Sequence, residues 1–320
     1  MRRLYIFGAM LISAVSCHSL APACSICRCG DQAFFINNAN LLPRGSWVIT
    51  LENLYLNKSS LHEEFQSNHH DILASPKPFA PLEISHGDES ELQSHRQNNL
   101  QIVLNYGLTN RMMLLASFPY TFNSFSQDNE HLRINGFGDP ELAAILNLAT
   151  LLNGTLTIAA NIGVRLPFGK TDHRNNKAEL LDAHDQIGNG AFASLAGFQI
   201  NRFNCEIPFF FSATYQLNGA GAHDFRYGNV FRINLATQRP LSHRLDIIVE
   251  VNGRMADFDK EINLKNPHSG GTILYFSPGL RLHLPGSLAL RGQAQIPMLE
   301  KLNGVQNEKT NLRGGLVWSL

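Results

Sequence analysis

Apolar and polar residues alternate from about residue 45 to the last residue, and this pattern limits the fold more than any other feature. Segments 154–166, 244–255 and 287–298 show it clearly. Successive side chains of a β-strand point to opposite sides, so each segment predicts a strand with one apolar and one polar face. The pattern predicts twelve strands, at about 46–56, 97–108, 111–120, 139–149, 154–166, 188–200, 203–217, 227–239, 244–255, 271–284, 287–298 and 310–320.

The lengths of the links between these segments separate two kinds of all-β fold. Alternation alone also fits a soluble sandwich. Here the links after even-numbered segments are short, as at 109–110 and 285–286, whereas those after odd-numbered segments are long, beginning with 57–96. Short turns at one end and long loops at the other are typical of outer-membrane barrels. We therefore predict a single antiparallel transmembrane β-barrel of about 12 strands.

The last segment and the two tryptophans agree with a closed barrel. Alternation continues to Leu320, as in the terminal strand that outer-membrane assembly machinery recognises. Trp47 and Trp318 open the first strand and close the twelfth. We expect these strands to pair, with both indoles at the periplasmic interface. Four prolines within the expected strands should lie near rims or bulges, since proline cannot donate to a ladder: Pro119, Pro208, Pro278 and Pro297.

The first residues predict export. Arg2 and Arg3 precede an apolar stretch at 4–15, and 21–23 (Ala-Pro-Ala) fits a signal-peptidase site. Twelve apolar residues are too few to cross about 30 Å of hydrocarbon. A lipoprotein-like cut before Cys17 is the alternative. We therefore divide the chain into a signal peptide (1–23), a Cys-rich periplasmic segment (24–45) and a barrel (46–320), in the bacterial outer membrane with both termini periplasmic.

Eight charged residues fall on the polar faces of the predicted strands. In a barrel surrounded by lipid these faces line the interior, where a charge needs a partner or water. One interpretation is a hydrated path or binding cavity; the other is a packed network of ion pairs that fills the barrel. The lumen-lining candidates are Glu52, Arg165, Arg232, Asp246, Glu250, Arg281, Arg291 and Arg313.

Three cysteines in six residues, Cys24, Cys27 and Cys29, are the most distinctive local feature. Their thiolates could bind a soft metal such as copper or zinc. A disulfide in the oxidising periplasm, which Cys205 could join, is an alternative, as is no fixed role. The segment could also tuck into the barrel as a plug, together with Phe34, Phe35 and the Leu41-Leu42 pair.

Other functional classes lack support in the sequence. Lys and Arg number 26 against 26 Asp and Glu, so there is no positive excess for binding nucleic acid. No serine-hydrolase elbow, HExxH pair or phosphate-binding glycine loop occurs. We expect no enzymatic activity and assign no catalytic residues.

Segment 163–172, GVRLPFGKTD, resembles the strand-to-loop segment of a bacterial outer-membrane transporter-like family of the phenol meta-pathway type. Segments 106–111, 136–140 and 270–280 support the resemblance. The start CSICRCGD is similar to a Cys-rich subgroup but departs from it at Gln32. The resemblance implies an exported barrel that passes or binds small molecules, with no assigned catalytic residues.

These observations favour a channel or transporter in which lumen charges select small-molecule solutes. Its expected partners are outer-membrane lipid, the solute and the outer-membrane assembly machinery. The alternative is a metal- or redox-binding protein that uses Cys24, Cys27 and Cys29, with the barrel as its anchor.

Overall fold

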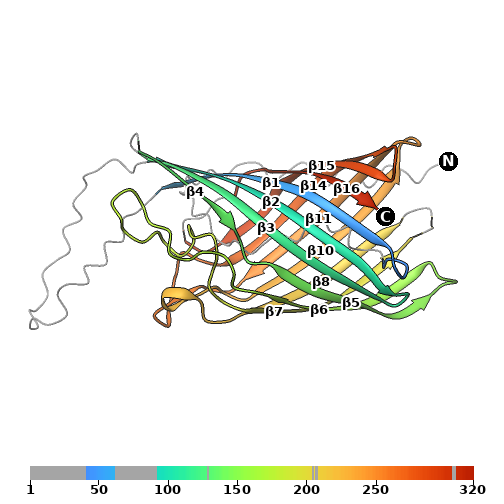
Figure 1. Cartoon of the computed structure of the whole chain (residues 1–320), viewed down its shortest axis with the longest axis horizontal. Helices are drawn as coiled ribbons and strands as arrows, with labels where there is room; N and C mark the ends of the chain where they lie inside the picture. Colours follow the sequence, from blue (N-terminus) through green and yellow to red (C-terminus); the bar gives the residue numbers. More distant parts are fainter. Residues whose placement is uncertain (1–40, 62–91, 128–129, 204, 206–207, 305–307) are drawn as a thin grey trace, which may run out of the picture.

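The computed structural model describes residues 41–61, 92–127, 130–203, 205, 208–304 and 308–320. In this part of the chain, twelve tilted antiparallel strands form a closed transmembrane β-barrel (Figure 1). The barrel strands are β1 (Trp47–Leu61), β2 (Leu92–Thr109), β3 (Met112–Gln127), β4 (Glu130–Phe137) and β5 (Glu141–Leu151) as two parts of one strand, β6 (Leu156–Arg165), β7 (Ala193–Arg202), β8 (Phe209–Asn218), β10 (Val230–Pro240), β11 (Leu245–Ala256), β14 (Gly271–Leu284), β15 (Leu288–Leu302) and β16 (Asn311–Ser319).

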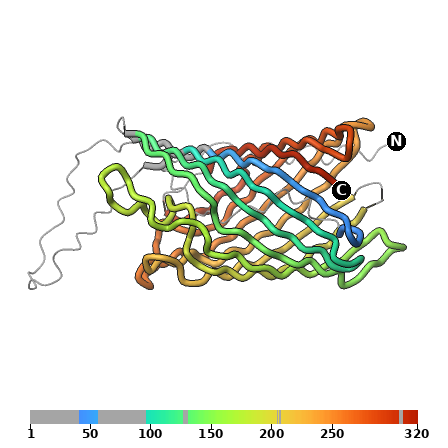
Figure 2. The backbone as a smooth tube through the Cα atoms, in the orientation of Figure 1, coloured from blue at the N-terminus to red at the C-terminus, as the bar shows by residue number. Residues whose placement is uncertain are grey.

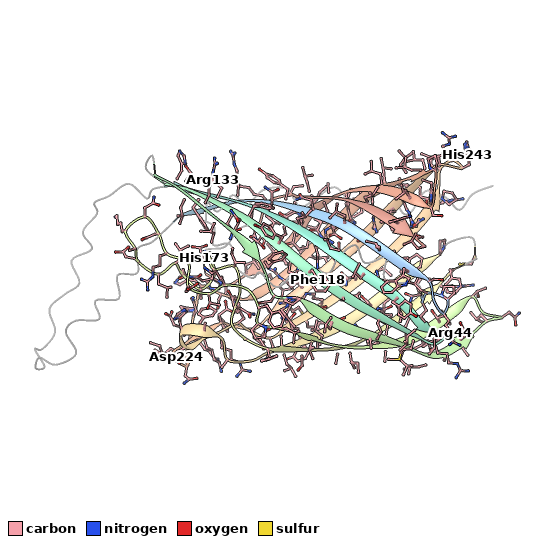
Figure 3. The ribbon with its side chains drawn as sticks, in the orientation of Figure 1. Arg44, Phe118, Arg133, His173, Asp224 and His243 are labelled. Atoms are coloured by element: carbon pink, nitrogen blue, oxygen red, sulfur yellow. The ribbon has the colours of Figure 1, made fainter. Side chains whose placement is uncertain are left out.

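The barrel closes between its first and last strands. β1 pairs with β2 on one edge and with β16 on the other, where Ile49 lies opposite Trp318. The links 110–111, 152–155, 241–244 and 285–287 are short turns at one end, which we call the turn rim. The links 166–192, 219–229 and 257–270 lie at the other end, the loop rim. In Figure 3, Arg44 and His243 mark the turn rim, and His173 and Asp224 the loop rim.

One strand of the barrel is broken. β3 pairs first with β5 and then with β4, and residues 138–140 interrupt the strand between them. Pro119 on β3 lies opposite this break and accepts a hydrogen bond from the Gly138 amide through its carbonyl. Because a residue's N–H and C=O point to the same side of a strand, the donor that Pro119 lacks faces the break. The expectation of a long loop after the third strand was wrong, since β3 and β4 extend that hairpin.

The other three prolines also lie at ends or irregularities, as expected. Pro208 directly precedes β8. Pro297 is at the bulge where the register between β14 and β15 shifts, and Pro278 lies in a stretch without paired residues between these two strands. Each therefore avoids a position that would need its amide proton.

The outer surface of the barrel is apolar. Large aliphatic and aromatic side chains alternate outward along every barrel strand, and many are about half exposed, including Leu148, Ile162 and Leu290. Trp47 and Trp318 are 41% and 42% exposed at the turn rim, and the Trp47 ring lies 4.5 Å from that of Tyr106. A belt of this kind is what a lipid-facing barrel requires.

At the loop rim, a short 3-10 helix, η1 (Ala222–Asp224), precedes a small sheet of β9 (Phe225–Arg226), β12 (Lys260–Glu261) and β13 (Leu264–Lys265). The segment that follows β6, yellow-green in Figure 2, lies beside these elements. Among the described residues, no helix is long and apolar enough to cross a membrane.

Ion pairs fill one half of the barrel interior. Six of the candidates project inward from β1, β11, β14, β15 and β16, and we call this set the charged wall: Glu52, Asp246, Glu250, Arg281, Arg291 and Arg313. Arg291 donates to Glu250 at 2.5 Å, and Arg313 lies 3.2 Å from Glu52, with all four side chains at most 3% exposed. Charges removed from water this completely are stable only when paired.

Breaking one of these pairs should destabilise the barrel. Arg291→Met leaves the Glu250 carboxylate buried without this partner, so we expect a loss of about 3–5 kcal/mol in the free energy of unfolding. Urea unfolding of the folded chain in lipid vesicles measures this loss. The double variant Arg291→Met, Glu250→Leu should recover most of it, because both charges are then gone. An unchanged unfolding midpoint in the single variant would contradict a structural role for the pair.

A cavity inside the barrel

A cavity of about 160 Å³ occupies the interior beside the charged wall. Seven amide side chains on β2, β6, β7 and β8 form one side of it, which we call the amide wall: Gln97, Asn99, Gln101, Asn161, Gln199, Gln216 and Asn218. Hydroxyl groups of Ser117, Thr121 and Tyr227 add to this surface. Apolar side chains, among them Leu115 and Leu195, complete it. The cavity is thus mainly neutral, with both hydrogen-bonding and apolar surface.

The structure places the eight candidate residues in three settings. Glu52 and Arg165 line the cavity. The other five residues of the charged wall do not: Asp246, for example, is held by Gln238 at 2.5 Å and by His283 at 2.7 Å. Arg281 is opposite Asp246 in the ladder between β11 and β14. Arg232 on β10 lies between the two walls and donates to Gln216 at 2.9 Å.

The three carboxylates that line the cavity all have partners. Glu52 lies beside Arg313, and Glu141 lies 3.4 Å from Arg165. The Asp139 carboxylate accepts the backbone amides of Gly169 at 2.8 Å and Asn189 at 3.1 Å. The cavity surface therefore presents compensated charges between neutral amides.

Asp139 anchors the loop that covers the cavity at the loop rim. Its two bonds hold both ends of loop 166–192, at Gly169 and Asn189. These ends approach so closely that a side chain at Gly188 would collide with the Gly169 backbone. Ile187, two residues before the clamped Asn189, packs against Phe125 and Ile134 and lines the cavity. The predicted strand at 139–149 begins at Asp139 and did not reveal this role, although an Asp directly after a Gly and before a Pro marks a site of irregular backbone.

The far end of the loop packs on neighbouring loops. The Tyr227 hydroxyl donates to the Ala183 carbonyl at 2.8 Å. The His184 ring lies 5.0 Å from that of Phe225, and its Nε2 is 3.5 Å from the buried Asp259 carboxylate. These contacts join three links of the loop rim into one cover.

Two leucines pack inside the barrel towards the turn rim. Leu42 packs against Val48 and Val317 on one part of the wall, and Leu41 and Leu42 both pack against Met113 and its neighbours on another. The following turn is fixed because the Gly45 amide donates to the Gly107 carbonyl at 2.7 Å and the Gly107 amide donates to the Ser46 carbonyl at 3.0 Å. The Leu41-Leu42 pair of the segment that could form a plug thus packs on interior residues, whereas Phe34 and Phe35 lie outside the described residues.

These contacts do not test whether the N-terminal cysteines bind a soft metal. Cys24, Cys27 and Cys29 lie outside the described residues, as does the expected signal peptide. Cys205 lies in the link between β7 and β8 at the turn rim rather than at the start of a strand, because β8 begins only at Phe209. Within the described part of the chain, no group of three or more His, Cys, Asp or Glu side chains could hold a metal ion. Soft-metal binding and the absence of enzymatic activity stay predictions.

Solved structures share this fold, whereas no family model and no curated protein matches the sequence. An outer membrane channel from Pseudomonas putida F1 is 13% identical over 88% of this chain and 98% of that one, with a TM-score of 0.63. The translocator domain of the autotransporter NalP from Neisseria meningitidis is 9% identical over 89% and 91%, with a TM-score of 0.45. The chain thus has the barrel fold of an outer membrane channel. The phenol meta-pathway family and its Cys-rich subgroup remain an interpretation of the motifs.

The Asp139 anchor should control how often loop 166–192 opens. Asp139→Ala removes two charge-assisted hydrogen bonds of about 1.5–3 kcal/mol each, so trypsin cleavage at the exposed Arg174 and Lys177 should accelerate at least tenfold. Asp172→Ala, which removes an exposed carboxylate from the same loop, is the matched control and should leave the rate unchanged. Equal cleavage of both variants and the natural chain would show that Asp139 does not hold the loop.

Proposed function

We propose that this protein is an outer-membrane channel for small solutes, with its turn rim and both termini in the periplasm. The observation that carries the proposal is a hydrogen-bonding cavity inside a closed transmembrane barrel. Ile187 lines this cavity, and the Leu41-Leu42 pair packs against Ile145, another lining residue. The fold of the Pseudomonas putida channel supports it. The predicted signal peptide and the terminal strand, as a signal for the assembly machinery, are consistent with export to this membrane.

Selection in this channel follows from the residues beside the cavity. We assign the five members of the charged wall that do not line the cavity to holding the barrel together. Arg291 pairs with Glu250, Arg313 with Glu52 and Asp246 with His283, and Arg281 lies opposite Asp246. Glu52, Arg165 and the amide wall contact the passing solute. This refines the sequence hypothesis in which opposing lumen charges select the solute.

Conduction requires an opening at both ends. The cover at the loop rim is held by hydrogen bonds and aromatic contacts, whereas the turn rim is closed near the wall by apolar packing of two leucine side chains. Apolar constrictions in a pore act as barriers because water and ions leave them. We therefore place the main barrier to ion flow at the Leu41-Leu42 pair.

Single-channel recording in planar bilayers tests the proposal. The variant Leu41→Ser, Leu42→Ser should conduct at least about twofold more than the natural chain, because water can then wet the constriction. Leu151→Ser, an exposed leucine at the turn-rim end of β5, is the matched control and should conduct like the natural chain. Silence from the natural chain, from the double variant and from a chain without 24–45 would overturn the proposal.

A further inference from the structure

We infer that the cavity is a binding site for a small neutral polyhydroxylated molecule of about the size of one sugar ring. This inference rests on the proposed function, because it names the class of solute that the channel would take up. It goes beyond that function by assigning the recognition to Gln199 and Asn161 and by excluding charged solutes as preferred ligands.

Two side chains of the cavity lining carry a buried carbonyl oxygen that has no hydrogen-bond donor among the described residues. Gln199 on β7 is 5% exposed, and within the described part of the chain its Oε1 has no partner. Asn161 on β6 uses its Nδ2 to donate to Thr214 at 3.3 Å, while its Oδ1 has no partner among the described residues. Both side chains line the cavity. A buried acceptor left unpaired costs free energy, so a ligand that donates to it is stabilised.

Asn161 and Gln199 are neighbouring residues on the inner face, and a glycine lies opposite Asn161. Asn161 lies opposite Gly197 in the ladder between β6 and β7, and Gln199 is two residues further along β7 on the same face. A side chain at Gly197 would meet the Asn161 Oδ1 at 2.6 Å. Gly197 thus leaves room for the Asn161 carbonyl over β7. Two acceptors on neighbouring residues suit a ligand that carries more than one hydroxyl group.

The charge distribution favours a neutral ligand. Each carboxylate of the lining is already bound by Arg313, Arg165 or backbone amides, as described above. An anion or a cation would lose its hydration in this cavity without gaining an opposite charge that is not already engaged. Removing a neutral hydroxyl group from water costs much less free energy than removing an ion, and hydrogen bonds to the amides replace those that the hydroxyl made to water.

The remaining surface suits the carbon framework of such a molecule. Leu115, Ile145 and Leu195 present apolar side chains beside the amides. A sugar ring has C–H faces as well as hydroxyl edges, so it can satisfy both kinds of surface at once. The volume of about 160 Å³ is below the 300–1,000 Å³ of sites for drug-sized ligands, which limits the occupant to a single small ring or chain.

Ligand-observed saturation-transfer NMR on the full chain in detergent micelles tests the inference without requiring conduction. The neutral probes are glucose and xylose, the charged probes are gluconate and glucosamine, and phenol is the apolar probe. Glucose and xylose should bind at one saturable site, with gluconate, glucosamine and phenol each at least tenfold weaker. A charged probe or phenol that binds as tightly as glucose overturns the inference, as does the absence of any sugar binding.

Variants at the acceptor pair make the test specific to the site. Gln199→Leu should weaken glucose binding about five- to tenfold through the loss of one hydrogen bond. Gln295→Leu is the matched control, because Gln295 is 2% exposed with an unpartnered Oε1 but lies on β15 away from the cavity lining. Gln199→Glu adds a carboxylate and should reverse the preference, so that glucosamine binds more tightly than glucose. Equal losses in Gln199→Leu and Gln295→Leu would overturn the assignment.

The two proposals fail separately. A chain that conducts ions but binds no sugar contradicts the ligand assignment alone. A chain that binds glucose but never conducts contradicts the channel alone. A heat-dependent shift in electrophoretic mobility confirms that each variant has folded before either measurement.

Discussion

The backbone pairing of β1 with β16 is the contact on which the rest of the structure depends. A transmembrane sheet cannot leave an edge in lipid, because each unpaired N–H or C=O group would cost several kcal/mol there. Pairing from Val48 with Ser319 to Tyr55 with Leu312 removes that edge and creates an inside and an outside. Only after closure do the polar faces of all strands converge on one interior, where their groups must satisfy one another.

The polar groups of the interior find their partners in different ways on the two sides of the barrel. On the charged wall, long Arg and Glu side chains reach across strands and fill space, so pairing and packing coincide. On the amide wall, neutral Asn and Gln side chains hydrogen-bond to one another, as Gln216 Nε2 does to Asn218 at 2.6 Å, and the cavity lies beside them. The three arginines of the charged wall have no counterpart among these seven side chains.

The period-two pattern was sufficient to predict the fold, because each strand of a closed barrel has one lipid face and one interior face. All twelve predicted strands appear, and the two tryptophans do lie together at one rim. Strand ends were less accurate: β3 continues to Gln127 because the hairpin with β4 extends beyond the apolar belt, where alternation no longer signals burial. The inward placement of Arg291 and Arg313 was also predictable from the alternation. Whether each side chain meets water or a carboxylate depends on the strands beside it, which the sequence of one strand does not show.

The cavity could not be read from the sequence, because it is defined by three segments that are distant in the chain. Ile187 reaches it only because Asp139, about 50 residues earlier, holds both ends of its loop. Leu41 and Leu42 pack inside the barrel because Gly107, more than 60 residues later, lets the backbone at Pro43 approach β2 closely. Both closures thus rest on a few local contacts attached to a rigid wall. Local contacts of this kind open at much lower cost than the barrel unfolds, so such a chain can admit a solute while its ladder stays intact.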